Sequence, residues 1–345
     1  MKKLIAWIAQ HQVVSFYLIT FAIMYGLGFS FKSVINRNEF LMAPFLMIAL
    51  CSPALTGILI TRLTNTQPRQ GSRKAFWITF AVGEVLALLV FLANNKFINQ
   101  APLSTPLVLF SCLMVLPVAF IIATANSRVP ALKAYLGSLI RMRGVWGWCA
   151  LALVTTPALI LITMVLKGLI SGMPVELPRF PVRGWALTGL VVVKLLYQFF
   201  FFNATGEEAG WRGFAQPRLQ VRLSPLVVAL ILAVFWAPWH FFLWQAEGSP
   251  VKSVDFWIGQ YASHIPATFW IVWFYNRSKG SILVAGIMHA VANTAVFFVN
   301  NLDLQLFNLV QLAVLVILIL LDRMWKKLPA DHPAVYRTEQ VVETG

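Results

Sequence analysis

Long apolar stretches separated by short polar segments recur from one end of the sequence to the other. Each stretch holds about 19 to 21 residues, which is long enough for a helix to cross a hydrocarbon core of about 30 Å. Because a spanning segment must satisfy its backbone hydrogen bonds internally, stretches of this length predict helices. The pattern predicts about ten spans, at residues 13–31, 40–60, 75–93, 107–125, 147–167, 185–205, 226–244, 256–275, 281–299 and 304–322.

The composition supports the same class of protein. Hydrophobic residues make up 59% of the 345 residues and charged residues only 11%, whereas soluble domains contain about 25% charged residues. We therefore expect an all-α, polytopic transmembrane helix bundle in contact with membrane lipid. The expected count is about ten spans, within a range of eight to ten, because the first and last spans are the weakest.

The distribution of basic residues predicts the topology. The chain has 27 Lys and Arg against 12 Asp and Glu, which gives a net charge of +15. With ten spans and a cytoplasmic N-terminus, most of the basic residues fall on the cytoplasmic side, as the positive-inside rule requires. Both termini are therefore expected in the cytoplasm, and the membrane is expected to be a bacterial inner membrane. Topology and anionic lipid explain the charge, so nucleic acid is not an expected partner.

The pattern divides the chain into four parts, which are N-terminal transmembrane helices at 1–180, a core carrying the polar residues described below at 185–300, a final transmembrane helix at 301–324 and a polar tail at 325–345. Leu132, Leu136 and Leu139 recur at helical spacing beside basic residues. This spacing predicts a basic interfacial helix near 127–144. The tail is expected to be mobile and cytoplasmic because its composition is polar.

Ionisable residues inside spans are rare and usually face a cavity or a partner, so they mark the candidate site. In this chain the polar residues of interest are Glu84, Lys194, Glu207, Glu208, His240, His289 and Asn293. Glu84 is expected to hydrogen-bond another span while protonated, or else to line the entry to the site.

The segment GEEAGWRGF, residues 206–214, places two carboxylates and an arginine after an apolar run. Glu208 and Arg212 are four residues apart and can pair on one helix face, whereas Glu207 is turned about 100° away. The pair would hold Glu208 ionised and leave Glu207 free for proton transfer. The alternative is that all three are interfacial charges that cap a span.

The depth of Glu207 depends on where its span begins. In the span 185–205, Glu207 lies at the cytoplasmic edge. If Lys194 extends to the outer interface, the span becomes 195–215 and Glu207 lies about 12 Å inside the membrane, close to the depth of His289.

His289 and Asn293 are four residues apart on an otherwise apolar helix, and His240 follows Pro238, which loosens its helix. Each histidine alone is more typical of a helix-to-helix hydrogen bond. Together with Glu207, however, these residues supply a base, an orienting imidazole and two donors for an oxyanion. This set can activate water against a carbonyl group.

These motifs resemble those of the CPBP family, the CAAX protease and bacteriocin-processing (Abi) intramembrane metalloproteases. GEEAGWRGF resembles the E-E-x-x-x-R motif, His240 resembles the histidine of the second motif, and MHAVAN matches H-x-x-x-N. The three motifs stand in the family's order, so residues 185–300 resemble its protease core. The preceding spans carry no such resemblance, and they leave the substrate open.

The resemblance implies an intramembrane endopeptidase that hydrolyses a peptide bond of a membrane-associated protein or peptide. Glu207 would be the general base, Glu208 and Arg212 its support and His240 a second contact for the water, while His289 and Asn293 would stabilise the oxyanion. The family is classed with metalloproteases, and Glu207, His240 and His289 are acceptable Zn²⁺ ligands. The sequence has no HExxH pair, so a metal-bound water and a water activated by glutamate alone both stay open.

Two functions of other classes also stay open. One is a non-catalytic membrane protein on the same scaffold, such as an immunity or export-assisting protein. The other is an ion-coupled transporter that uses Glu84, Lys194 and Glu207, since intramembrane charges also mark ion paths. The sequence shows no duplicated half, which argues mildly against transport.

Overall fold

The computed structural model describes residues 2–34, 39–175, 177–178, 180, 182–299 and 301–337, and every regular element within them is a helix. This confirms the all-α class. In the N-terminal half the helices are α1 (Lys2–Gln10), α2 (Gln12–Val34), α3 (Glu39–Leu50), α4 (Ser52–Thr64), α5 (Arg73–Ala93), η1 (Asn94–Ile98), α6 (Thr105–Met114), α7 (Leu116–Thr124), α8 (Pro130–Ile140) and α9 (Trp146–Ser171).

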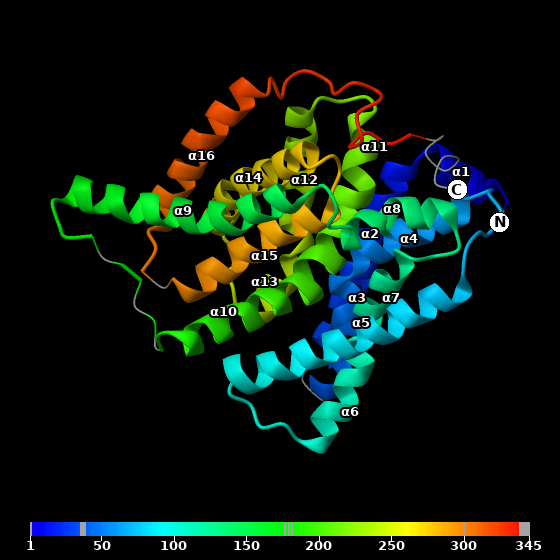
Figure 1. The fold of residues 1–345 in the computed structure, drawn as a ribbon, viewed down its shortest axis with the longest axis horizontal. Helices are drawn as coiled ribbons and strands as arrows, with labels where there is room; N and C mark the ends of the chain where they lie inside the picture. The colour runs from blue at the N-terminus through cyan, green and yellow to red at the C-terminus, as the bar shows by residue number, and fades with distance from the viewer. Residues whose placement is uncertain are drawn as a thin grey trace.

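The C-terminal half carries the predicted core. Its helices are α10 (Trp185–Gln198), η2 (Phe199–Glu208), η3 (Trp211–Ala215), α11 (Gln216–Gln220), α12 (Pro225–Trp239), α13 (Phe241–Ala246), α14 (Val254–Arg277), α15 (Ile282–Phe298) and α16 (Leu304–Leu321). In Figure 1, α15 runs between α9 and α10 and packs against both. It also packs against η2 and α14, so α15 lies at the centre of this half.

By length and composition, seven helices among the described residues can cross a membrane, or eight if the bent pair Pro44–Leu50 and Ser52–Thr64 is one span. A count of eight is the lower limit of the expected eight to ten spans, and a count of seven is below it. The predicted span 40–60 is bent by 68°. The predicted span 281–299 corresponds to α15, which has 17 residues, and 256–275 corresponds to α14, which carries polar residues along its length. The cytoplasmic location of both termini stays a prediction.

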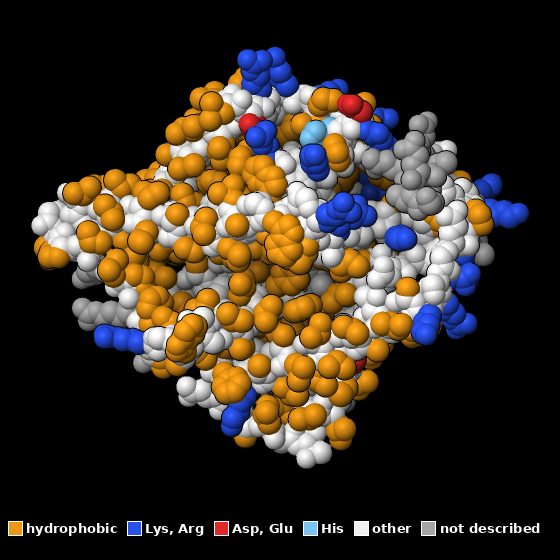
Figure 2. Space-filling model, in the orientation of Figure 1, with side chains coloured by type: hydrophobic (Ala, Val, Ile, Leu, Met, Phe, Trp, Pro, Cys, Tyr) orange, Lys and Arg blue, Asp and Glu red, His pale blue; other side chains and the backbone are white. Residues whose placement is uncertain are grey.

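The surface supports a lipid environment. On the face shown in Figure 2, hydrophobic side chains cover the molecule over α9, α10 and α6, while Lys and Arg gather along the upper and right-hand edges. Leu169 and Ile170 of α9 are 73% and 75% exposed. Large exposed apolar surfaces of this kind mark contact with a membrane or a partner.

The helix that carries the predicted carboxylates continues from Trp185 to Gln220. It therefore contains both of the registers considered for the sixth span, and Glu207 and Glu208 lie inside it rather than at its end. Lys194 is buried, with 9% of its surface exposed, so its side chain points into the bundle. The register 195–215 would instead have it extend to the outer interface.

The middle of this helix is π-helical. Thr205 Oγ1 donates a hydrogen bond to the carbonyl of Phe200, five residues earlier, across one wide turn of η2. Segments of π-helix are rare and often occur at functional sites.

Small residues let the neighbouring helices approach this segment closely. A Cβ atom on Gly210 would collide with the backbone of Pro53 in α4, and a Cβ atom on Gly286 of α15 would collide with Ala204 of η2. Such close backbone contacts are typical of packing between transmembrane helices. They hold η2 and η3 between α4 and α15.

A helix forms within the predicted interfacial segment 127–144. The apolar face of α8 is buried through Leu132, Leu136 and Leu139, and Lys133 is exposed. The Tyr135 hydroxyl donates a 2.6 Å hydrogen bond to the carbonyl of Ala209. Helix α8 therefore supports the junction of η2 and η3, and its location at the leaflet surface stays a prediction.

The described part of the tail packs against the bundle, which differs from the mobile tail that was expected. Gln220 Nε2 donates to the carbonyl of Ala334 at 2.7 Å, and the backbone N–H of Tyr336 donates to the carbonyl of Pro217 at 3.0 Å. These bonds depend on backbone groups and on the small buried Ala334, which a polar composition does not reveal. Residues 338–345 lie outside the described residues.

Replacing Gly210 by Ala is expected to destabilise the protein, because the added methyl group would meet the Pro53 backbone and overpacking costs about 1–3 kcal/mol. The measurement is thermal unfolding of the purified protein in detergent. Gly189→Ala is the matched control, since a Cβ atom there meets nothing within 4 Å. It should leave the melting temperature unchanged or raise it slightly, and equal losses in both variants would contradict the close approach.

Candidate active site

Glu207 lies near the end of η2 and is 5% exposed. The indole Nε1 of Trp236 in α12 donates a hydrogen bond to Glu207 Oε2. The Nε2 atom of His240 is 3.8 Å from the same oxygen. Glu207 and His240, which were predicted from separate motifs, are therefore adjacent. The hydrogen bond from Trp236 orients the Glu207 carboxylate.

The tautomer of His240 follows from its other nitrogen. Helix α12 ends at Trp239, and His240 Nδ1 lies 3.0 Å from the carbonyl of Trp236. A carbonyl only accepts, so Nδ1 carries the proton and Nε2 of the neutral ring is an acceptor. Glu207 Oε2 and His240 Nε2 are then two acceptors 3.8 Å apart. One water molecule can donate a proton to each of them.

The second carboxylate is paired with a buried cation. Glu208 and Arg212 are both 0% exposed, and Arg212 Nη1 is 3.0 Å from each oxygen of Glu208. The predicted pair is thus present in the structure. His289 Nδ1 lies 2.7 Å from Glu208 Oε1, a contact that the sequence spacing did not indicate. Because a carboxylate accepts, Nδ1 of His289 carries a proton and its Nε2 is left for another partner.

His289 and Asn293 both line the cavity described below, one helical turn apart on α15. Asn293 Nδ2 lies 3.4 Å from Oδ1 of Asn203, which is fully buried in η2. Asn203 was not among the predicted residues. The available signal was its position four residues before Glu207, as a polar residue in an apolar run.

His264 was also missed, although it lies inside the predicted span 256–275 and met the same criterion as the other histidines. Its ring centroid is 5.3 Å from that of His240 and 4.9 Å from that of Trp236. Its Nδ1 is 2.8 Å from the carbonyl of Gln260 and therefore carries the proton. The site thus contains three histidines, since His289 also faces Trp236.

Glu207 and the three histidines share one cavity of about 660 Å³, within the range of small-ligand sites. Glu208, Arg212 and Asn203 do not line it. Its polar lining includes Glu207, His240, His264, His289 and Asn293. Aromatic rings form much of the remaining wall, and they are Tyr197, Phe202, Trp236, Trp244, Trp270, Phe297 and Phe307. A mostly apolar cavity with a few convergent polar groups is the usual form of a binding or active site.

Glu84 lies on α5, away from this group. It is absent from the described residues that line the cavity. Its Oε2 atom is buried without a hydrogen-bond partner among the residues that the structure describes. The hydrogen bond that was expected from Glu84 to another span is therefore not observed at Oε2. Helix α5 packs mainly against α7, and no polar side chain of α7 forms a hydrogen bond with this oxygen.

Glu207, His240 and His289 are the ligands expected if the protein uses a metal, and the described residues do not group them as a three-ligand site. The described part of the chain contains no group of three or more His, Cys, Asp or Glu side chains arranged to hold a metal ion. Glu207 and His240 form a pair, and no third His, Cys, Asp or Glu side chain of the described residues is grouped with them. Structural and catalytic zinc sites in proteins have three or four protein ligands, and Glu207 with His240 supplies two.

Two comparisons with known proteins bear on this chain. Residues 185–295 match the family described as type II CAAX prenyl endopeptidase Rce1-like, and this range holds all six predicted site residues. A protein named CAAX prenyl protease 2 from Methanococcus maripaludis is 30% identical over 142 residues, which are 40% of this chain and 51% of that protein. The chain thus matches about half the length of this relative.

Replacing Arg212 by Met should destabilise the protein by about 3 kcal/mol or more, because it removes one partner of a fully buried ion pair. The double variant Glu208→Gln with Arg212→Met should recover part of this loss, since the amide is neutral and its oxygen can still accept from His289. The free energy of unfolding can be measured by SDS titration in mixed micelles. A double variant no more stable than Arg212→Met would show that the charge of Glu208 is not the cause.

Proposed function

We propose that this chain is an intramembrane endopeptidase of the CPBP family of CAAX proteases, a proposal supported by the match of residues 185–295 to the Rce1-like family. It hydrolyses a peptide bond of a membrane-associated protein or peptide. The observation that carries this proposal is the pair of acceptors, Glu207 Oε2 and His240 Nε2, which lie 3.8 Å apart at the same cavity. Its membrane is proposed to be a bacterial inner membrane.

Water activation follows from the two acceptors. A water held by Glu207 and His240 gives one proton to the Glu207 carboxylate while its oxygen attacks the carbonyl carbon of the scissile bond. The N–H of Trp236 keeps the carboxylate in place. As the C–N bond breaks, the protonated Glu207 returns this proton to the leaving amine. The reaction consumes one water and leaves the side chains as they began.

We expect two side chains of α15, His289 and Asn293, to stabilise the oxyanion. His289 Nε2 can donate to the oxyanion when the ring carries a second proton, and the Glu208 carboxylate beside Nδ1 stabilises that imidazolium. The charges of Glu207, Glu208, Arg212 and His289 then sum to zero, which suits a buried site. Asn293 keeps one amide N–H free beyond its bond to Asn203, so it can be the second donor.

Glu207→Gln should lower proteolysis by at least about a hundredfold, since a general base contributes about 10² to 10⁴ in rate. The measurement compares new peptide termini in membranes of cells that express the wild type or the variant at matched levels. Glu84→Gln is the control and should cleave like the wild type, because Glu84 lies outside the cavity. A phenotype that persists unchanged in Glu207→Gln would favour the non-catalytic alternative, and dependence on Glu84 would favour transport.

Chelation should leave cleavage unchanged, because the described residues provide no three-ligand metal site. The test treats the purified protein with EDTA and with 1,10-phenanthroline and measures cleavage of a substrate found by the terminus comparison. Elemental analysis of the same sample gives its metal content. If cleavage is lost on chelation and returns on adding Zn²⁺, this prediction is wrong. The attacking water is then bound to zinc, and Glu207 and His240 are ligands of the metal.

A further inference from the structure

One helix outside the active site contacts both of the helical segments that carry it. None of the residues of α8 lines the cavity of Glu207, yet α8 packs against η3 and against α15. Tyr135 and Ser138 of α8 are three residues apart, so they lie on the same face of this helix. Each of them forms a hydrogen bond with the backbone of a different segment of the site.

Tyr135 contacts the segment that carries the two carboxylates. Its hydroxyl donates a 2.6 Å hydrogen bond to the carbonyl of Ala209, which follows Glu207 by two residues. The hydroxyl lies beside α4, where a Cβ atom on Gly57 would collide with it. The ring lies against η3, where a Cβ atom on Gly213 would collide with it. The side chain is therefore held between two helices, and it fixes the backbone directly after the carboxylates.

Ser138 contacts the helix that carries the oxyanion donors. The backbone N–H of Ile282, the first residue of α15, donates a 3.2 Å hydrogen bond to Ser138 Oγ. The first N–H groups of a helix have no partner inside it, so this bond satisfies a group that α15 cannot satisfy itself. Ile282 precedes His289 by seven residues, or about two helical turns, so both lie on the same face of α15. A shift of Ile282 would therefore also shift His289.

The two contacts of α8 meet at Gly213. A Cβ atom at this position would collide with the Tyr135 ring and also with the side chain of Ile282. Helix α8, η3 and the start of α15 thus pack together where no methyl group fits. In a closely packed interior a displacement of one element is transmitted to its neighbours. The three elements therefore form one junction.

We propose that Tyr135 and Ser138 are positioning residues, which fix the Glu207 carboxylate relative to the oxyanion donors His289 and Asn293. The inference rests on the proposed peptidase function. In that reaction the attacking water is held from η2 and the oxyanion from α15, so both must keep one relative position. A misplacement of about 1 Å can lower the rate about a hundredfold. Helix α8 supplies a connection between them that does not pass through the cavity.

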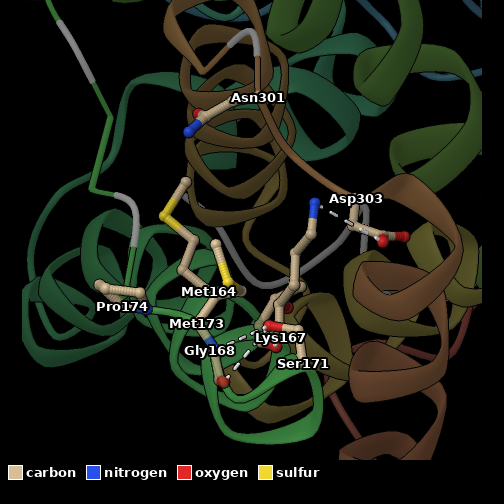
Figure 3. Close-up of a pocket in the computed structure, with 9 residues that line it drawn as sticks. Met164, Lys167, Gly168, Ser171, Met173, Pro174, Asn301 and Asp303 are labelled. Carbon is tan, nitrogen blue, oxygen red and sulfur yellow. Dashed lines mark hydrogen bonds and ion pairs between the residues drawn. The ribbon is translucent and has the colours of Figure 1, made fainter.

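A different contact between helices provides a comparison. Lys167, near the end of α9, lies 3.9 Å from Asp303, which precedes α16. Figure 3 shows the Lys167 ammonium group directed at Asp303, beside a smaller cavity of about 210 Å³. Neither α9 nor α16 carries a predicted site residue. Loss of this ion pair should therefore leave the positions of Glu207 and His289 unchanged.

The experiment measures kcat and KM per amount of folded protein in detergent, with a peptide substrate found by the terminus comparison. Tyr135→Phe and Ser138→Ala each remove only a hydroxyl group. Each should lower kcat at least about tenfold and change KM by less than about twofold, because the geometry of the reacting groups is altered and not the binding of the peptide.

Two control variants should keep the kcat of the wild type. Tyr17→Phe is matched to Tyr135→Phe, since the hydroxyl of Tyr17 is buried without a hydrogen-bond partner among the residues that the structure describes. Lys167→Met removes a contact between helices that do not carry the site. An unchanged kcat in either Tyr135→Phe or Ser138→Ala, or a rise in KM alone, would overturn the proposal.

The double variant tests whether the two residues form one connection. The link from η2 to α15 through α8 requires both hydrogen bonds, so breaking either one removes it. Tyr135→Phe combined with Ser138→Ala should therefore lower kcat no further than the larger of the two single losses. A loss equal to the product of the single losses would show that the residues act independently, and it would overturn the proposal.

Hydrogen exchange separates this proposal from the proposed function. Amide exchange of each purified protein is followed by mass spectrometry over residues 199–215 and 282–298. Tyr135→Phe should raise the exchange rate in the first segment and Ser138→Ala in the second, each at least about threefold, because each loses an anchor outside its own helix. The controls should match the wild type.

Faster exchange in these two segments supports the connection through α8 even if the wild type cleaves no peptide, in which case the proposed function alone fails. Unchanged exchange in both segments overturns the positioning role. Cleavage by the wild type would then leave the peptidase function in place.

Discussion

The buried charge of Glu208 is the constraint on which the rest of the site depends. A carboxylate with no exposed surface, inside a helix that crosses the membrane, is stable only with close donors. Arg212, one turn along, supplies one donor, and His289 supplies the other from α15. The second donor requires α15 and η2 to approach closely, which Gly286 and Ala204 permit because a larger residue at Gly286 would collide. The ion pair and the small residues are therefore two parts of one packing arrangement.

This arrangement also explains why adjacent glutamates can have different environments. Neighbouring residues of a helix point about 100° apart, so Glu208 faces Arg212 and His289 while Glu207 faces Trp236 and His240. Glu207 receives a neutral indole N–H and has no cation at hydrogen-bonding distance among the described residues. A carboxylate that is oriented but not tied to a cation keeps an oxygen available for a water molecule.

The sequence predicts the parts of this site that depend on local spacing. The Glu208–Arg212 pair follows from an interval of four residues, and the apolar stretches predict an all-α bundle in a membrane. The contact of Glu208 with His289 could not be predicted, because it joins residues 81 positions apart through tertiary packing. The depth of Glu207 was ambiguous for a similar reason, since hydropathy windows do not reveal that α10, η2, η3 and α11 form one long helical run. The described tail residues pack through backbone bonds to α11, which composition does not encode.

The environment of Lys194 could also not be predicted from the sequence, because it depends on tertiary packing. From sequence, a lysine inside a span is expected to extend toward an interface, because that is its least costly position in a membrane. In the structure the side chain is buried in the cavity against Phe297 and lacks an acidic partner among the described residues. A fold selected only for stability would pair or remove this charge, as it pairs Arg212 with Glu208. Proteins retain such costs mainly at functional sites, and Lys194 lines the same cavity as Glu207 and His240.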